Sequence, residues 1–172
     1  LWPKARNSVG LQMAYAKFLR RTDRNREGAV ALSEYVTKTR RGRPELLRLW
    51  CDLALEAGDP SLYRPAIEFH ESLLRRGDRW RLVHMYLAGW GARLDEDADS
   101  ARKNLGDFLR DGGDRLMVEE GRHARRMLVD IHLELGEAES AVEVLEAVLS
   151  DSPGSVEHRA RLAGLQWKVM GR

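Results

Sequence analysis

The sequence predicts an all-α fold in which helix-turn-helix units stack one on another as an α-solenoid. Apolar residues recur along it at the i, i+3, i+4 and i+7 spacing of amphipathic helices. Glycines that can end a helix recur at an interval of 35 residues, at Gly42, Gly77 and Gly112. A unit of this length cannot bury its apolar face alone and has to stack on a neighbour, so the interval favours a solenoid over a closed single core.

The composition agrees with helices that carry charged outer faces, since 43% of the 172 residues are hydrophobic and 33% are charged. No apolar run approaches the roughly 20 residues of a membrane span. The formal net charge of +2 gives no overall attraction to polyanions. Cys51 is the sole cysteine, which excludes an internal disulfide, and its apolar surroundings indicate a buried structural thiol. Because the chain begins without Met and ends within a helical pattern, we expect a fragment of a longer protein.

Three units are expected at approximately 8–42, 43–77 and 78–113. The apolar spacing places two helices in each unit: Leu11–Arg21 with Glu27–Thr39, Pro44–Ala57 with Ala66–Leu74, and Trp80–Tyr86 with Ala98–Leu109. Polar links, or links that contain Gly and Pro, separate the paired helices: TDRNREG, AGDPSLYRP and GWGARLDED. The last of these is expected to be a long turn around Trp90.

A fourth unit is expected at approximately 121–153. Its first helix is predicted at Ala124–Leu135, and Gly136 stands where a tight turn between helices needs a residue without a Cβ. Its second helix is predicted to stop at Pro153.

Two further segments complete the predicted array. Extra chain before the fourth unit, at Leu116–Gly121, predicts either a prolonged helix or a kink at Gly121. A last amphipathic helix, at approximately 156–170, has no partner helix. It is interpreted either as a cap or as the start of a fifth repeat.

Two of these units resemble known repeats. The fourth is similar to the tetratricopeptide repeat, with matching residues at Leu128, His132, Gly136, Ala141, Leu145, Leu149 and Pro153. It departs from that pattern at Arg125, Val129 and Val148. The third resembles the related Sel1-like repeat, with matching residues at Leu82, Tyr86, Gly89, Gly91, Asp95, Ala101, Leu105 and Gly112.

The resemblance implies a right-handed superhelix whose concave groove binds another protein through a peptide, a helix or a loop. Repeats of these two kinds occur together in bacterial envelope proteins that organise exopolysaccharide export. The resemblance therefore implies such an assembly as the process, with a periplasmic or envelope-associated location favoured over a cytoplasmic one.

No catalytic constellation is predicted. The sequence has no HExxH, no paired CxxC and no phosphate-binding glycine loop. Four histidines fall in helices of different units, at His84, His123, His132 and His158, so the spacing predicts no metal site. We expect His132 to have a packing role. No enzyme activity and no cofactor is expected.

One set of charged and apolar residues recurs in the same register on the first helix of two units. Counting back from Gly58 and from Gly136 gives the members of this first-helix column: Arg48, Asp52, Leu55 and Glu56, then Arg126, Asp130, Leu133 and Glu134. Residues spaced by four lie along one helical face, and the resemblance places this face in the groove. Two interpretations stay open: a charged partner-binding groove, or surface pairs of Arg48 with Asp52 and Arg126 with Asp130.

A second hypothesis concerns arginine clusters that recur with the 35-residue period. They include Arg40, Arg41, Arg75, Arg76 and Arg79. On a stacked array they would form a basic edge for nucleic acid or an acidic glycan. Nucleic acid is the less expected partner, because nearby acids weaken the field and the aromatic residues fall mostly at core spacings. A third alternative is a cytoplasmic regulatory repeat module.

Overall fold

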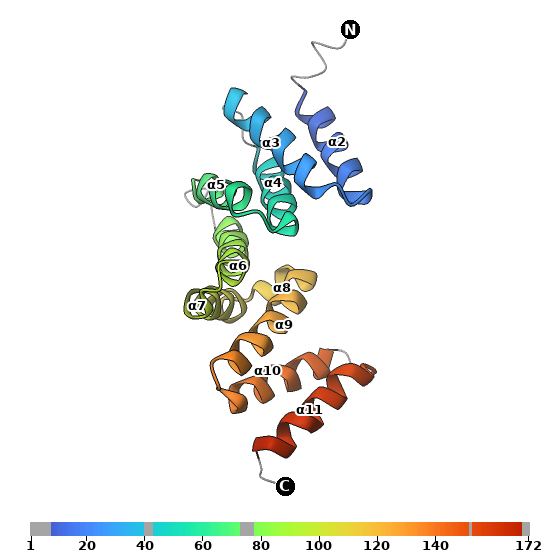
Figure 1. The fold of residues 1–172 in the computed structure, drawn as a ribbon, viewed down its shortest axis with the longest axis vertical. Helices are drawn as coiled ribbons and strands as arrows, with labels where there is room; N and C mark the ends of the chain where they lie inside the picture. Colours follow the sequence, from blue (N-terminus) through green and yellow to red (C-terminus); the bar gives the residue numbers. More distant parts are fainter. Residues whose placement is uncertain (1–7, 40–42, 73–77, 152, 170–172) are drawn as a thin grey trace. The chain divides into compact units, whose positions relative to one another are not determined.

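The computed structural model describes residues 8–39, 43–72, 78–151 and 153–169, without the side chains of residues 78, 79, 151 and 169. Within these ranges the chain forms ten helices and no strand (Figure 1). Their bounds are α2 Val9–Arg21, α3 Asn25–Thr39, α4 Pro44–Ala57, α5 Pro60–Glu71, α6 Asp78–Leu94, α7 Ala98–Arg110, α8 Gly113–Leu116, α9 Val118–Glu134, α10 Ala138–Asp151 and α11 Val156–Val169. The predicted all-α fold of packed helix hairpins is confirmed.

The chain divides into two compact units, Leu1–Leu87 and Ala88–Arg172. The first contains α2 to α5 and the larger part of α6, and the second contains the end of α6 and α7 to α11. Within each unit, helices that follow one another in the chain pack side by side (Figure 1). This is the packing that hairpins without a core of their own require.

In the first unit, α4 lies between neighbours on both sides, α3 and α5. Its apolar residues Leu46, Trp50 and Leu53 are no more than 3% exposed. The helix α3 approaches closely at Gly28, where an added Cβ would lie 3.0 Å from Leu53 Cδ1. Successive hairpins therefore share one apolar interface.

The second unit has an equivalent core between α9, α10 and α11. Val129, Ala141, Leu145 and Leu165 are buried there, and Leu133 packs against them. The helix α7 also packs against α9. Helices α9, α10 and α11 thus bury apolar side chains against one another.

A residue with left-handed backbone conformation follows each of the first helices α2, α4, α6 and α9 within two residues of its end. Gly58 and Gly136 have φ values of 65° and 76°, as expected for helix ends. Asp23 and Glu96 take the same conformation, with φ values of 57° and 60°, although it is strained for residues with a Cβ. Residues at the same distance before these four turn residues therefore occupy equivalent positions on the first helices α2, α4, α6 and α9.

The predicted long turn around Trp90 is wrong, because α6 continues to Leu94. Gly89 lies within the helix and serves close packing, since an added Cβ would lie 2.7 Å from the Leu105 side chain. The predicted link AGDPSLYRP between the two helices of the repeat at 43–77 is also shorter. Helix α5 begins at Pro60, where the Asp59 side chain accepts a hydrogen bond from the backbone N–H of Ser61.

Most of the extra chain at Leu116–Gly121 is a prolonged helix, because α9 begins at Val118, and the chain does not kink at Gly121. The break falls at Met117, after the short helix α8. Gly121 is buried within α9, where an added Cβ would lie 2.6 Å from Asp114 Cα. The glycine therefore allows the α8 backbone to approach α9.

Candidate functional site

The first-helix column lies on α4 in the first unit and on α9 in the second. Positions in it are numbered back from the turn residue, so Arg48 and Arg126 occupy position −10, Asp52 and Asp130 position −6, and Glu56 and Glu134 position −2. The same positions make different contacts in the two units.

In the first unit, Arg48 and Asp52 form the predicted pair on α4. Arg48 Nε donates to Asp52 Oδ1 over 2.8 Å, and the two side chains are 18% and 13% exposed. The Arg48 guanidinium also lies over the Tyr86 ring, 5.2 Å from its centroid. Burial raises the pKa of Asp52, against the opposing effect of the Arg48 and Arg20 charges. These contacts use Arg48 and Asp52 for packing between first helices.

An ion pair between consecutive first helices recurs in both units. Arg20 of α2 forms a two-pronged contact with Glu56 of α4, with Nε 3.1 Å from Oε2. Arg93 of α6 forms the same contact with Glu134 of α9, with Nη1 2.7 Å from Oε2. In each case an arginine at position −3 meets a glutamate at position −2 of the next first helix. Glu56 and Glu134 therefore have partners within the chain.

Sequence analysis missed Arg20 and Arg93, although a signal exists. Their common position is visible only when Asp23 and Glu96 are used as turn residues. The glycine pattern that marks Gly58 and Gly136 does not mark these two positions, because neither Asp23 nor Glu96 is a glycine.

In the second unit, the predicted pair between Arg126 and Asp130 does not form. Asp130 instead accepts a short hydrogen bond from Arg161 of α11. Arg126 is exposed, and its Nε donates over 3.4 Å to the backbone carbonyl of Arg122. The α11 arginine outcompetes Arg126 for the carboxylate and leaves the Arg126 guanidinium facing solvent.

The two leucines of the column differ in burial. Leu55 is 2% exposed. Leu133 is half-buried and packs against the core of the second unit. As a correction to the predicted groove, Leu55 offers no side-chain surface to a partner.

An aromatic pair includes His123, which lies three residues before Arg126 on α9. Trp90 of α6 and His123 of α9 meet edge to face, with centroids 4.7 Å apart and ring planes at 89°. Burial lowers the pKa of His123, and the Arg126 charge adds to this effect. Trp90 stands at position −6 of its helix, the position that Asp52 and Asp130 occupy in theirs. Because the sequence predicts a turn at Trp90, it does not predict that Trp90 occupies this helix position.

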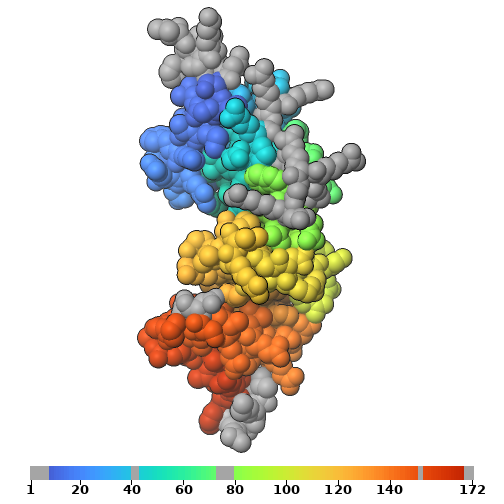
Figure 2. Space-filling view, turned by 180° about the vertical axis from the view of Figure 1, so that it is seen from behind, coloured from blue at the N-terminus to red at the C-terminus, as the bar shows by residue number. Residues whose placement is uncertain are grey.

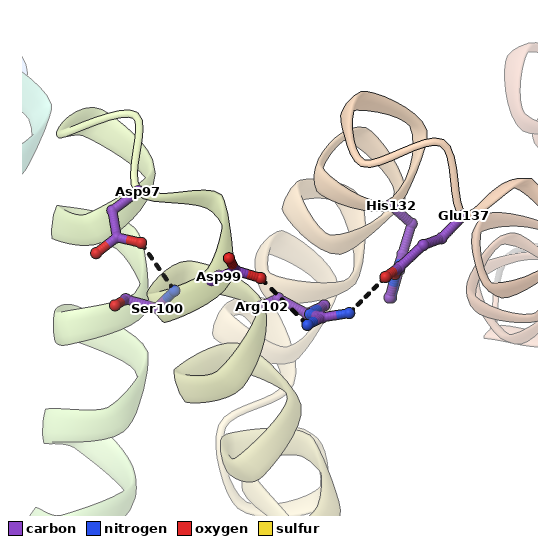
Figure 3. A network of polar contacts seen from close by, with 6 residues as sticks. All are labelled: Asp97, Asp99, Ser100, Arg102, His132 and Glu137. Atoms are coloured by element: carbon purple, nitrogen blue, oxygen red, sulfur yellow. Dashed lines mark hydrogen bonds and ion pairs between the residues drawn. The ribbon is translucent and has the colours of Figure 1, made fainter.

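A second polar network joins the second helices of consecutive hairpins (Figure 3). Arg102 of α7 lies between Asp99 on its own helix and Glu137 at the start of α10, with Nη1 2.5 Å from Glu137 Oε1. His132 Nδ1 is 2.7 Å from Glu137 Oε2, so His132 has a polar role in addition to its predicted packing role. The hydrogen bond from His132 is the main cause that lowers the pKa of Glu137.

The first unit has a looser counterpart of this network, in which Arg26 of α3 lies 3.4 Å from Asp59 at the start of α5. Glu137 and Asp59 each directly follow a turn residue. Polar contacts between hairpins thus repeat on the second helices as they do on the first.

The predicted arginine edge falls outside the described part of the chain. Arg40, Arg41, Arg75 and Arg76 lie outside the described residues, and the Arg79 side chain is likewise not described. Within the described ranges, no group of three His, Cys, Asp or Glu side chains is arranged to hold a metal ion. Among the same residues, no helix combines the length and apolarity that a membrane crossing requires.

The contacts between hairpins define a helical-repeat protein. Residues 122–165, which include α10, most of α9 and much of α11, match the family model of the tetratricopeptide repeat. This stretch is a tetratricopeptide repeat, as its resemblance predicted. No curated protein matches the chain. The repeat suggests a scaffold for interactions between proteins.

Proposed function

We propose that the chain is a non-enzymatic scaffold that binds a carboxylate-bearing segment of a partner protein on the first-helix face of the second unit. Arg126 is the residue that would contact the carboxylate, beside the rings of Trp90 and His123. The exposed guanidinium of Arg126 is the observation that carries the proposal, because its described contact is one long hydrogen bond to a carbonyl. Arginine binds carboxylates through two parallel hydrogen bonds.

The charges around Arg126 support this choice of partner chemistry. Asp130 is paired with Arg161, and Glu134 is paired with Arg93. These two ion pairs leave Arg126 as the uncompensated charge of the column in this unit. A partner carboxylate would therefore meet a positive charge without displacing an existing partner. Trp90 offers an apolar ring for a neighbouring side chain of the same segment.

The remaining column residues hold the first helices in position under this proposal. Arg48, Asp52 and Glu56 make their contacts within the first unit, and Asp130 and Glu134 make theirs within the second. A rigid surface reduces the ordering cost of binding, which is the advantage that such pairs supply.

Affinity capture with quantitative mass spectrometry tests the proposal. The baits are the wild type, Arg126→Glu and the matched control Arg159→Glu, which changes another exposed arginine of the same unit. A protein captured by the wild type and by Arg159→Glu, and lost with Arg126→Glu, supports the proposal. Equal capture by all three baits, or equal loss with both variants, contradicts it.

The cellular setting and the anionic-polymer alternative stay predictions from the sequence. The exopolysaccharide-export setting and the envelope location rest on the resemblance alone. The anionic-polymer alternative depends on arginines whose side chains lie outside the described part of the chain. Retardation of nucleic acid or an acidic glycan by the wild type at low salt, abolished by Arg75→Ala and Arg76→Ala, would favour that alternative.

A further inference from the structure

An exposed apolar stripe runs along α2 in the first unit. Its members are Leu11, Tyr15 and Phe18, which are 44%, 47% and 53% exposed. At 3.6 residues per turn they fall within an arc of about 60° on one side of the helix. The neighbours α3 and α4 pack on other sides of α2, whose buried residues are Ala16 and Leu19. The space-filling view shows the dark-blue atoms of α2 at the surface of this unit (Figure 2).

Positions counted back from the turn residues identify the residues of α4 and α9 that are equivalent to this stripe. Counted from the turn residue Asp23, its members occupy positions −12, −8 and −5. The same positions of α4 hold Leu46, Trp50 and Leu53, which are at most 3% exposed. Those of α9 hold Ala124, Leu128 and Ile131, which are at most 4% exposed. The stripe on α2 is therefore exposed and apolar at positions that are apolar and buried on α4 and on α9.

In both comparisons a helix of the preceding hairpin lies against the first helix. Helix α3 packs on α4, with Gly28 directly against Leu53 at position −5. Helix α7 packs on α9. The preceding helix is in each case the second helix of its hairpin, and it is amphipathic. An amphipathic helix of the preceding hairpin thus covers position −5 of α4, and the Trp50 ring at position −8 meets the Phe69 ring of α5, the second helix of the same hairpin.

The charges beside the stripe indicate the chemistry of its occupant. Lys17 and Arg21 lie within about 100° of Phe18 on one flank, and neither forms an ion pair with a described residue. Helix α2 contains no acidic residue. Arg21 occupies position −2, where α4 and α9 carry Glu56 and Glu134, so the sign of the charge is reversed on α2. A second copy of α2 would bring like charges together, which disfavours a symmetric dimer on this face.

We propose that this face of α2 is a docking site for an acidic amphipathic helix of a partner protein. The apolar side of that helix covers Leu11, Tyr15 and Phe18, and its carboxylates pair with Lys17 and Arg21. Arg20, which pairs with Glu56, lies about 140° or more around α2 from the stripe. The site is therefore separate from the first-helix face proposed above, and it lies in the other unit.

A peptide with the sequence of α10, Ala138–Asp151, is the probe for this site. It is an amphipathic second helix of this chain and carries Glu139, Glu143 and Glu146. Its binding to the whole chain is measured by fluorescence anisotropy at low salt. The variants are Phe18→Asp, which places a charge in the stripe, and Lys17→Glu combined with Arg21→Glu, which changes only exposed side chains. Val156→Asp changes an exposed apolar residue of the second unit and is the control.

We expect Phe18→Asp and the double charge reversal each to weaken peptide binding by about tenfold or more, and Val156→Asp to leave it unchanged. We also expect a peptide with its three glutamates changed to glutamine to bind more weakly to the wild type. Absence of binding, or binding that the charge reversal leaves intact, overturns the proposal. Self-association of the chain that Phe18→Asp abolishes would assign the stripe to a second copy, and would also overturn it.

Discussion

His70 of α5 is expected to make the stability of the first unit depend on pH. Its side chain is fully buried, and neither ring nitrogen has a hydrogen-bond partner among the described residues. Its ring stacks on that of His84 in α6, with centroids 6.0 Å apart and planes at 11°. Burial lowers the pKa of His70 to about 4, and the charges of His84 and Arg48 add to the effect. The folded protein therefore holds this imidazole in its neutral form.

The size and the sign of the effect follow from these values. A pKa of about 4 in the folded state, against about 6.5 in the unfolded state, corresponds to about 3 kcal/mol of unfolding free energy. The unfolded chain binds more protons between these two pH values. The contribution of His70 is therefore fully present above pH 6.5 and is lost as the pH falls from about 6.5 to about 4. Burial also lowers the pKa of His84, which acts in the same direction.

Urea unfolding at a series of pH values between 7.5 and 4.5 measures this dependence. His70→Leu removes both the titration and the unpartnered ring nitrogens, so it should flatten the profile without lowering stability at pH 7.5. His70→Gln is the matched control, because it removes the titration and keeps a buried polar group. It should flatten the profile equally and be less stable than the leucine variant throughout. Profiles of both variants parallel to that of the wild type would refute the assignment of the proton to His70.

Three further predictions concern backbone positions, and all are measured as changes in the urea midpoint. Gly136→Ala should destabilise the protein by about 1 kcal/mol and Glu96→Gly should stabilise it by about 0.5–1 kcal/mol, because each turn residue has a positive φ. A loss of stability with Glu96→Gly would show that this turn is not left-handed. Gly121→Ala should destabilise by about 1–3 kcal/mol, because its Cβ would lie 2.6 Å from the Cα of Asp114. Unchanged stability would mean that α8 and α9 are less closely packed than described.

Helix type and the hairpin pattern were predictable because the apolar spacing of each helix is local information. The boundaries were less predictable where glycine and proline serve packing instead of turns. Gly89 lies inside α6 against Leu105, and the signal for a turn at Trp90 was therefore false. The left-handed turn at Glu96 gave no sequence signal, because Glu is disfavoured in that conformation.

The sequence could predict which helices carry the candidate site, but not which residues form ion pairs with its charged side chains. The register from Gly58 and Gly136 placed the column on the first helices, but the partners of its charges lie on neighbouring helices. Arg161 of α11 forms an ion pair with Asp130, and Arg93 of α6 forms one with Glu134. Such contacts depend on how hairpins stack, which spacing along one helix does not specify. The pair between Arg48 and Asp52 was predictable because it lies within one helical turn of α4.

The common register of consecutive first helices is the central claim, and crosslinking between α6 and α9 tests it most directly. Arg93→Cys with Glu134→Cys replaces the two partners of the ion pair, and Leu94→Cys with Glu134→Cys shifts one thiol by a residue. Cys51 is fully buried and should not react with a short bismaleimide. We predict a high yield of internal crosslink for the first pair and a low yield for the shifted pair. Equal yields, or a higher yield for the shifted pair, would contradict the register.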